Sequence, residues 1–318
     1  MARILLTGGS SFTGLWIGEA LAAAGHAVVA ALRGPAGGYR GLRDERIVRL
    51  GRSVELVFDA PFASPRFIEL AGSGFDLLAH HAADIPNYRS PDYDVMEAVN
   101  RNLLAAEVVL TALASSGARA LIATGTTFEA REGRPGANDL AVSPYGLSKT
   151  LTNEALRHFA HWRGLSFGKF VIAAPFGPLE EGRFAWSLFQ SWTAGQPGKV
   201  RTPRYIRDNI PSPLLGQAYV ALANEMLGGG PNAEYAARPS GFVGAQASFA
   251  QLLAEEMRPR LGLACEIELL PQPELSEPEV RANTEPWLGR DWPASSFWDD
   301  YAAYYARLAR EGTLSSPA

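Results

Sequence analysis

The sequence predicts an α/β fold in which a doubly wound parallel sheet is followed by a smaller C-terminal lobe. Three observations predict it: short apolar runs alternate with helical patterns, a glycine-rich turn follows the first run, and the pattern becomes irregular and rich in proline and tryptophan after Pro175. Short apolar runs separated by helices are typical of parallel strands covered on both faces. The 318 residues, 47% of them apolar, suffice for a large buried core.

Six apolar runs are the predicted strands of this sheet, at residues 4–6, 27–32, 54–58, 77–79, 121–123 and 170–173. Helices are predicted over residues 14–24 and 96–115, because Gly25 and Gly117 follow their last positions and glycine ends a helix at low cost. The sheet is thereby assigned to the first part of the chain.

The segment TGGSSFTG, residues 7–14, follows the first predicted strand and opens the first predicted helix. Such a turn presents backbone N–H groups and a positive dipole end to a pyrophosphate. Ser11 stands where the three-glycine pattern has its middle glycine, and a purely structural turn is the alternative. The residues expected to hold a dinucleotide here are Gly8, Ser10, Ser11, Phe12, Thr13 and Gly14.

The second predicted strand ends at Arg33, and Arg40 and Arg43 follow in the next segment. Chains that bind NAD usually place an acid at this point, about 20 residues after the glycines, to bind the ribose 2′-hydroxyl. Guanidinium groups instead complement a 2′-phosphate. NADP(H) is therefore favoured and NAD(H) is the second choice, while a solvated strand end is the alternative reading of Arg33.

The segment SPYGLSK, residues 143–149, has the chemistry of a helix start, because serine is a good N-cap and Pro144 suits the first helical position. Tyr145 and Lys149 lie four residues apart and so share one helix face. An ammonium beside a phenol is expected to lower the pKa of that phenol. Tyr145 is therefore predicted to give a proton to a carbonyl oxygen while hydride reaches the carbon.

Six motifs together resemble the extended short-chain dehydrogenase/reductase family, also called the NAD-dependent epimerases and dehydratases: TGGSSFTG, VNRNLLAAEVVL, LIATGTTFEA, SPYGLSK, PFGP and RDNI. The resemblance covers nearly the whole chain. It implies a Rossmann domain that binds NADP over residues 1–174 and a lobe over residues 175–318 that mainly binds substrate, with segments at about 205–240 returning to the Rossmann sheet. It also implies a nucleotide-sugar site in the cleft beneath that lobe.

The same resemblance implies roles for single residues. Thr124 matches the hydroxyl residue that hydrogen-bonds the reacting oxygen, with Thr126 in reserve, and Lys149 matches the lysine that holds the nicotinamide ribose. Further cofactor contacts are implied for Asp59, Ala82, Asn100 and Pro175. Arg207 matches the arginine that meets the substrate diphosphate, and Arg183, Arg281 and Asn87 are further candidate substrate contacts.

Departures from the family pattern bear on the reaction. Gly125 and Thr126 stand where a dehydratase carries the acid and base that expel water. The ribose-binding acid that suits the tightly held NAD of an epimerase is missing from the second strand. Glu129 replaces the usual glycine after the aromatic residue, and Ala174 replaces an asparagine that contacts the phosphates in many members.

The expected reaction is therefore the NADPH-dependent reduction of a keto group on a nucleotide-linked sugar, such as a 4-keto-6-deoxy sugar. The alternatives are an NAD-dependent nucleotide-sugar epimerase or dehydratase, a reductase of a non-nucleotide carbonyl, and a non-catalytic protein that senses NADP.

Composition and charge argue against other functions. The net charge of −4 provides no basic field for nucleic acid. His80 and His81 end the fourth predicted strand, and His158 and His161 have helical spacing but no third ligand, so no metal is expected. The single cysteine, Cys265, and the lack of a signal peptide or a membrane-spanning run lead us to expect a cytoplasmic protein. Apolar helices near residues 100–115 and 150–160 match the two-helix dimer face common in the family, so the resemblance implies a homodimer.

Overall fold

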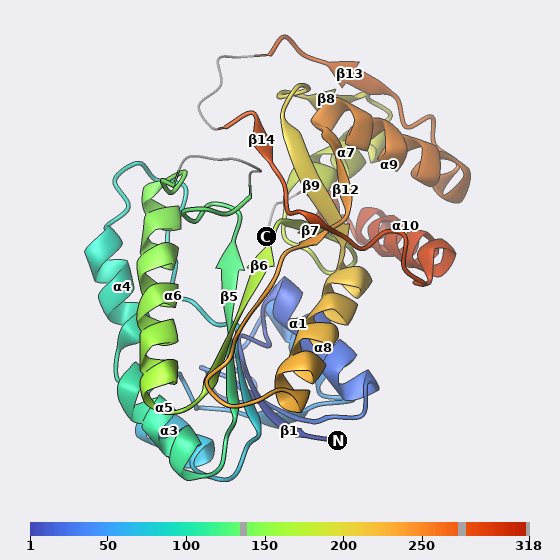
Figure 1. Ribbon diagram of the computed structural model, residues 1–318. Helices are drawn as coiled ribbons and strands as arrows, with labels where there is room; N and C mark the ends of the chain where they lie inside the picture. Colours follow the sequence, from blue (N-terminus) through green and yellow to red (C-terminus); the bar gives the residue numbers. More distant parts are fainter. Residues whose placement is uncertain (134–138, 273–277, 316–318) are drawn as a thin grey trace.

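The computed structural model describes residues 1–133, 139–272 and 278–315. Within these residues, seven parallel strands form the main sheet in the order β10-β6-β5-β4-β1-β2-β3 (Figure 1). Their bounds are β1 (Arg3–Thr7), β2 (Ala27–Ala31), β3 (Glu55–Val57), β4 (Leu77–His80), β5 (Ala120–Thr126), β6 (Ser166–Ile172) and β10 (Glu234–Ala237). The predicted doubly wound α/β fold is confirmed, and each predicted strand overlaps a strand of this sheet.

Helices cover both faces of the main sheet (Figure 1). One face carries α1 (Phe12–Ala23), α2 (Gly41–Leu50) and α8 (Ser212–Gly228), and the other carries α3 (Pro65–Ala71), α4 (Val95–Leu103), α5 (Ala106–Ser115) and α6 (Pro144–Trp162). Because successive strand side chains point to opposite faces, Leu5 packs in the core under α3, α5 and α6, whereas Ile4 and Leu6 pack under α1 and α8. No helix among the described residues is both long and apolar enough to cross a membrane.

The single helix predicted over residues 96–115 is wrong, because the structure has two helices there. Ala105 adopts φ 49°, a left-handed conformation, between α4 and α5. This break turns the chain between the two helices. As a result, α4 packs against α6, while α5 packs beside α3 in the core on the same face of the main sheet. The sequence hides it, since neither glycine nor proline stands at the break.

The second lobe is built around β9. Within the described residues, β9 pairs with β12, β14 and β7, while β13 pairs with β8 and β11 with β15. Its elements are β7 (Ala174–Phe176), β8 (Gly198–Val200), β9 (Ile206–Pro211), β11 (Pro239–Ser240), β12 (Phe242–Ala245), β13 (Ile267–Leu269), β14 (Val280–Arg281), β15 (Glu285–Pro286), α7 (Phe184–Thr193), α9 (Gln246–Leu261), α10 (Ala294–Arg310) and η1 (Thr313–Ser315). The lobe lies beyond the carboxyl ends of the main strands (Figure 1).

The chain crosses between the two parts more than once. β7 follows β6 directly and leaves the main sheet for the lobe. After β9, α8 returns to pack against α1, and β10 pairs with β6 at the edge of the main sheet. These crossings hold the lobe above the ends of β1, β4 and β5.

Candidate active site

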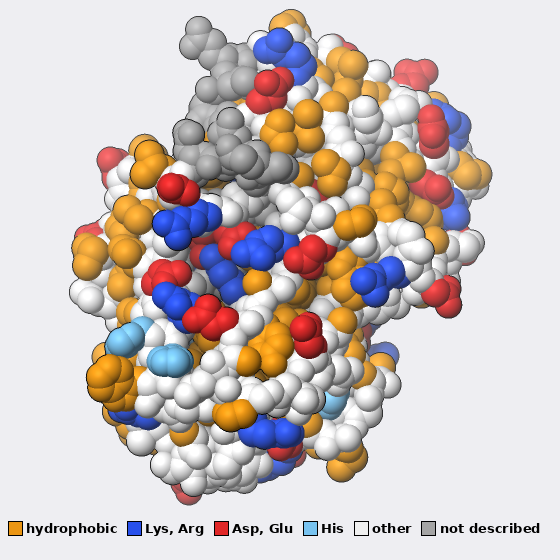
Figure 2. Space-filling model, viewed as in Figure 1, with side chains coloured by type: hydrophobic (Ala, Val, Ile, Leu, Met, Phe, Trp, Pro, Cys, Tyr) orange, Lys and Arg blue, Asp and Glu red, His pale blue; other side chains and the backbone are white. Residues whose placement is uncertain are grey.

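A cavity of about 940 Å³ opens at the carboxyl ends of the main strands, next to the second lobe. In open parallel sheets, ligands bind at this edge. Figure 2 shows basic and acidic side chains gathered on the surface between the two parts of the molecule. The predicted site residues that line the cavity are Gly8, Ser10, Ser11, Phe12, Thr13, Arg33, Ala82, Thr124, Thr126, Tyr145, Lys149, Pro175 and Arg183. Motifs far apart in the sequence therefore meet in one place.

The glycine-rich turn is shaped to bring backbone close to a ligand. Gly8 has φ +76°, and a Cβ there would lie 2.8 Å from the backbone nitrogen of Ala82. Ser11 is the N-cap of α1: its Oγ accepts a hydrogen bond from the Gly14 N–H at 3.0 Å and donates to the Gly8 carbonyl at 2.8 Å. The serine that replaces the middle glycine thus caps the helix whose first turn lines the cavity. Orphan N–H groups of such a turn fit a pyrophosphate.

The part of the cavity next to β2 is basic. Arg33 is exposed directly after β2 and lines the cavity together with Arg40 and Arg43. The acidic residues of the described lining are Asp84 and Glu181, which each pair with an arginine, at 2.9 Å and 2.7 Å. Neither follows β2, so the three arginines face this region without a competing carboxylate from that strand.

Tyr145 and Lys149 project from the first two turns of α6. The N-cap Ser143 accepts the Gly146 N–H at 3.2 Å, as its sequence position predicts. Gly146 lets α6 approach the segment after β5 closely, since a Cβ there would collide with the carbonyl group of Phe128. The Tyr145 ring then lies among the rings of Tyr88, Tyr93 and Phe128, with centroids 5.3, 6.2 and 5.8 Å away.

The charge state of this pair differs from the prediction. Burial raises the pKa of the Tyr145 phenol, the Glu129 carboxylate raises it further, and a hydrogen bond with Thr126 lowers it only in part. Burial also lowers the pKa of Lys149, although Glu129 opposes that shift. The predicted lowering of the phenol pKa by Lys149 is therefore wrong for this cavity. The reason is that burial penalises both the phenolate and the ammonium, so Tyr145 keeps its proton.

The two candidate threonines at the end of β5 have different partners. Thr126 hydrogen-bonds the Tyr145 phenol, whereas Thr124 Oγ1 lies 2.9 Å from Nδ1 of His81. Sequence reasoning missed His81 as a member of the site. The signal was its position directly after β4, at the same edge of the sheet as Thr124. Burial and, to a smaller extent, Lys149 lower the pKa of His81 to about 4, so its imidazole is neutral at neutral pH.

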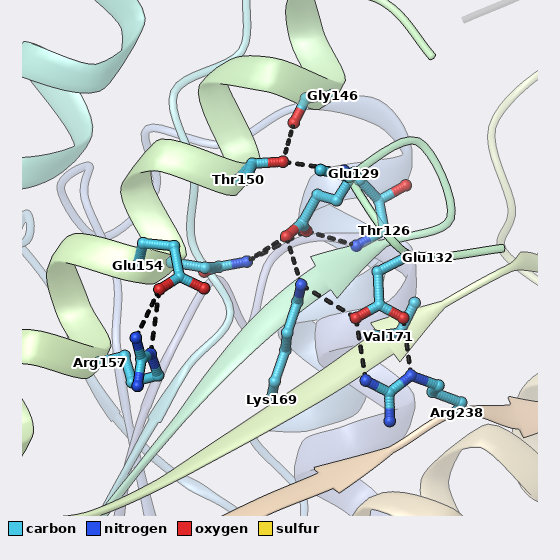
Figure 3. A network of polar contacts seen from close by, with 12 residues as sticks. Thr126, Glu129, Glu132, Gly146, Thr150, Glu154, Arg157, Lys169, Val171 and Arg238 are labelled. Atoms are coloured by element: carbon cyan, nitrogen blue, oxygen red, sulfur yellow. Dashed lines mark hydrogen bonds and ion pairs between the residues drawn. The ribbon is translucent and has the colours of Figure 1, made fainter. Parts of the chain in front are cut away.

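Glu129 contacts residues of β5, β6 and α6 (Figure 3). Its side chain is buried, with 1% of the residue exposed. The carboxylate accepts hydrogen bonds from the Thr126 backbone N–H at 2.8 Å and from Nδ2 of Asn153 in α6 at 3.1 Å. Its other partner is Lys169 of β6, whose Nζ lies 2.7 Å away. A Cβ at Gly125 would lie 2.9 Å from the Glu129 carboxylate, so the glycine makes room for it. The glutamate therefore links α6 to the end of β5 and to the middle of β6.

The buried charges continue from Lys169 toward the edge of the sheet (Figure 3). Lys169 Nζ lies 3.1 Å from Glu132, which accepts Nε and Nη2 of Arg238 at 2.7 and 3.1 Å. Burial alone would lower the pKa of Lys169, but the two carboxylates outweigh it and raise the pKa. The ammonium is therefore charged and shared by two buried glutamates.

Several predicted residues lie outside the cavity lining. Asn100 is exposed on α4, whereas Asn102 lines the cavity, accepts the Asp84 N–H at 2.7 Å and donates to the Asp84 carbonyl at 3.0 Å. Gly14 stays a structural part of the turn. Asp59 is exposed next to Ala60, Pro61 and Phe62, which do line the cavity. Among the described residues, no three His, Cys, Asp or Glu side chains gather as metal ligands.

The candidate substrate contacts are placed unevenly. Arg183 lines the cavity, whereas Asn87 is exposed outside it. Arg207 is buried and not part of the lining: its Nη1 donates to the carbonyls of Ile206, Pro278 and Glu279. The guanidinium of Arg281 lies 3.9 Å from the centroid of the Phe128 ring. Phe128 lines the cavity, whereas Arg281 does not. The structure thus brings the cofactor-side residues together more fully than the substrate-side ones.

The chain is similar to known proteins both in sequence and in fold. A model described as the NAD dependent epimerase/dehydratase family matches residues 4–204. No curated protein matches the sequence. A solved structure of UDP-glucuronic acid 4-epimerase from Bacillus cereus, in complex with UDP-glucuronic acid and NAD, is 18% identical; the match covers 96% of this chain and 99% of that one, with a TM-score of 0.71.

Two further solved structures are similar at comparable levels. UDP-glucose 4-epimerase from Stenotrophomonas maltophila with bound NAD is 16% identical over 98% of this chain and 100% of that one, with a TM-score of 0.71. DesIV, a dTDP-glucose 4,6-dehydratase from Streptomyces venezuelae with NAD, is 13% identical over 96% and 97%, with a TM-score of 0.69. At these identities the likeness establishes the fold over the 96–98% of the chain that is covered.

Proposed function

The chain belongs to the NAD dependent epimerase/dehydratase family, and from this we propose that it reduces a keto group on a nucleotide-linked sugar with NADPH. The observation that carries the proposal is the meeting of Tyr145, Lys149 and Thr124 with the glycine turn in one cavity. The two epimerases named above were solved with NAD and a UDP-linked sugar, which supports this class of substrate.

The residues of the cavity divide the work of such a reduction. The turn from Gly8 to Thr13 would hold the pyrophosphate, and Lys149 would hold the nicotinamide ribose. The chemistry supplied by a bound reduced nicotinamide is hydride transfer to the carbonyl carbon. Tyr145 would give its proton to the carbonyl oxygen, and the hydroxyl of Thr124 would hold that oxygen in place.

The environment of Tyr145 suits a proton donor. Burial and Glu129 raise the pKa of its phenol, and the group that protonates a carbonyl oxygen must carry a proton. The absence of a ribose-binding acid from the second strand argues against an epimerase that holds NAD tightly. A dehydratase needs an added acid and base, and Gly125 and Thr126 offer neither.

The direct test is turnover with a 4-keto-6-deoxy nucleotide sugar and NADPH, followed as loss of NADPH absorbance. Reduction is expected to proceed and to be inhibited by at least one of UDP, CDP, GDP and TDP. Turnover that no nucleoside diphosphate inhibits would point to a non-nucleotide carbonyl. Interconversion of sugar epimers without net NADPH loss would establish an epimerase, and NADPH binding without turnover of any ketone would establish a sensor.

We further propose that the 2′-phosphate of NADP(H) is bound by Arg33 with help from Arg40 and Arg43. Arg33→Asp is expected to raise the KM for NADPH by ~10-fold or more, because one charge-assisted hydrogen bond contributes ~1.5–3 kcal/mol, and to improve the use of NADH. The measurement is kcat/KM with each cofactor. Arg52→Asp is the control, since Arg52 is exposed just after α2, the helix that carries Arg43, but lies outside the cavity lining. An unchanged ratio in Arg33→Asp would contradict the assignment.

We also propose that the chain forms a homodimer through the outer face of α4, α5 and α6. Large apolar side chains of these helices are exposed: Met96, Val108, Leu147, Leu151 and Trp162. Figure 2 shows apolar side chains along this edge, and contiguous exposed apolar surface marks an interaction site. Light scattering is expected to give twice the mass of one chain, and Leu147→Glu with Leu151→Glu to give the single-chain mass. Val243→Glu, at an exposed position in the second lobe, should leave the mass unchanged.

A further inference from the structure

His81 connects the start of α1 to the end of β5. Its Nε2 lies 2.8 Å from Thr13 Oγ1, and its Nδ1 lies 2.9 Å from Thr124 Oγ1. Its backbone N–H donates to Thr7 Oγ1 at 3.0 Å, which fixes the imidazole at the end of β4. The ring therefore stands in the cavity between a residue of the pyrophosphate turn and the threonine assigned to the reacting oxygen.

A neutral imidazole has one N–H donor and one acceptor nitrogen. The two threonine hydroxyls on either side of His81 therefore cannot both donate to it, nor can both accept from it. If Nδ1 carries the proton, Thr124 accepts from His81 and its own O–H remains free. If Nε2 carries the proton, the Thr124 proton is used up on Nδ1, and only lone pairs are left to face the cavity.

Only the first arrangement suits a carbonyl oxygen, which accepts hydrogen bonds and repels lone pairs. We propose that His81 is a positioning residue whose Nδ1–H donates to Thr124, so that the Thr124 hydroxyl donates to the carbonyl oxygen of the substrate. Thr13 then donates to Nε2 and completes the chain. This inference rests on the proposed function, because it assigns a role within the reduction of a carbonyl.

Burial supports the neutral ring on which this chain depends. After burial, the charged group that lowers the pKa of His81 is Lys149. The neighbouring His80 is neutral, because burial and then Lys149 lower its pKa to about 3. Burial and the positive charge of Lys149 therefore disfavour a second proton on His81, and its single N–H persists at neutral pH.

The test is a set of matched substitutions at His81. The amide nitrogen of asparagine can replace Nδ1, whereas that of glutamine reaches the position of Nε2. His81→Asn is expected to keep kcat within ~3-fold of the parent, while His81→Gln and His81→Leu lower kcat by ~10-fold with little change in the KM for NADPH. In a Thr124→Val background, His81→Leu should cause no further loss, since the two residues act through one bond.

A merely structural role would make the three variants lose activity in step with their loss of thermal stability, and that outcome would overturn the inference. A second readout needs no turnover: ¹⁵N NMR of the labelled imidazoles, with His81 assigned by its absence from His81→Asn, is expected to show the proton on Nδ1. A proton on Nε2 would also overturn it. Lack of turnover by the parent protein would instead refute the proposed reduction and leave the ¹⁵N result to decide the hydrogen bond.

Discussion

Tyr145→Phe is expected to lower kcat by ~10²-fold or more, because it removes the proton donor while keeping the ring. The ring itself is held by its aromatic neighbours and by the close packing of α6 on Phe128, so the loss of one oxygen should leave the fold unchanged. The KM for NADPH should change little, since Tyr145 stands at the reacting end of the cavity. Steady-state kinetics with the preferred keto sugar measures both values.

Tyr93→Phe is the matched control for this substitution. Tyr93 is also buried, and its ring lies edge-on to Tyr145 with centroids 6.2 Å apart, but it does not line the cavity. Removing its hydroxyl should leave kcat within a few-fold of the parent. Equal activity of the two variants would remove Tyr145 from the mechanism.

The sheet, and the meeting of the glycine turn with the start of α6 in one cavity, could be predicted because local patterns encode them. Each strand is a short apolar run, and the turn before α1 and the start of α6 carry their chemistry in adjacent residues such as Ser11 and Ser143. The break at Ala105 could not be predicted, because a left-handed alanine has no local signature and tertiary packing decides it.

The electrostatics of the pair could not be predicted from spacing either. A separation of four positions places Tyr145 and Lys149 on one face of α6, but whether the phenol becomes more acidic depends on burial and on charges from other elements. Glu129 was visible as a departure from the family pattern, yet its partners Asn153 and Lys169 come from α6 and β6. Asn102 was missed for Asn100 because only the helix rotation in the structure shows which of them faces the cavity.

Of the candidate substrate contacts, Arg183 lines the cavity and Arg207, Arg281 and Asn87 do not, and the reason again lies in tertiary structure. Arg207 was assigned from a motif, but its backbone carbonyl partners arise when β14 comes beside β9. Such contacts between segments some 70 residues apart in the chain are set by tertiary structure. A motif therefore identifies the residue without telling whether it faces the ligand or its own backbone.

Lys169→Met is expected to lower the free energy of unfolding by ~3–5 kcal/mol, because it leaves a buried carboxylate without its cation. The carboxylate left without a cation is mainly that of Glu129, which is 1% exposed, because Glu132 keeps its contact with Arg238. Urea unfolding followed by circular dichroism measures the change. Because Glu129 also accepts the Thr126 N–H next to the reactive tyrosine, the variant should lose activity along with stability.

The control for Lys169→Met is Lys199→Met. Lys199 is 58% exposed and lies 4.0 Å from Glu268, and exposed pairs of this kind contribute ~0–1 kcal/mol. Adding Glu129→Gln to Lys169→Met should restore part of the lost stability, because a neutral amide needs no cation and can still accept from Thr126 while keeping a polar contact with Asn153. Two outcomes would contradict this role of Lys169: an equal free energy of unfolding for Lys169→Met and Lys199→Met, or a further loss of stability when Glu129→Gln is added. Either would mean that Lys169 does not compensate the charge of Glu129. The raised pKa of Tyr145 would then rest on burial and not on Glu129.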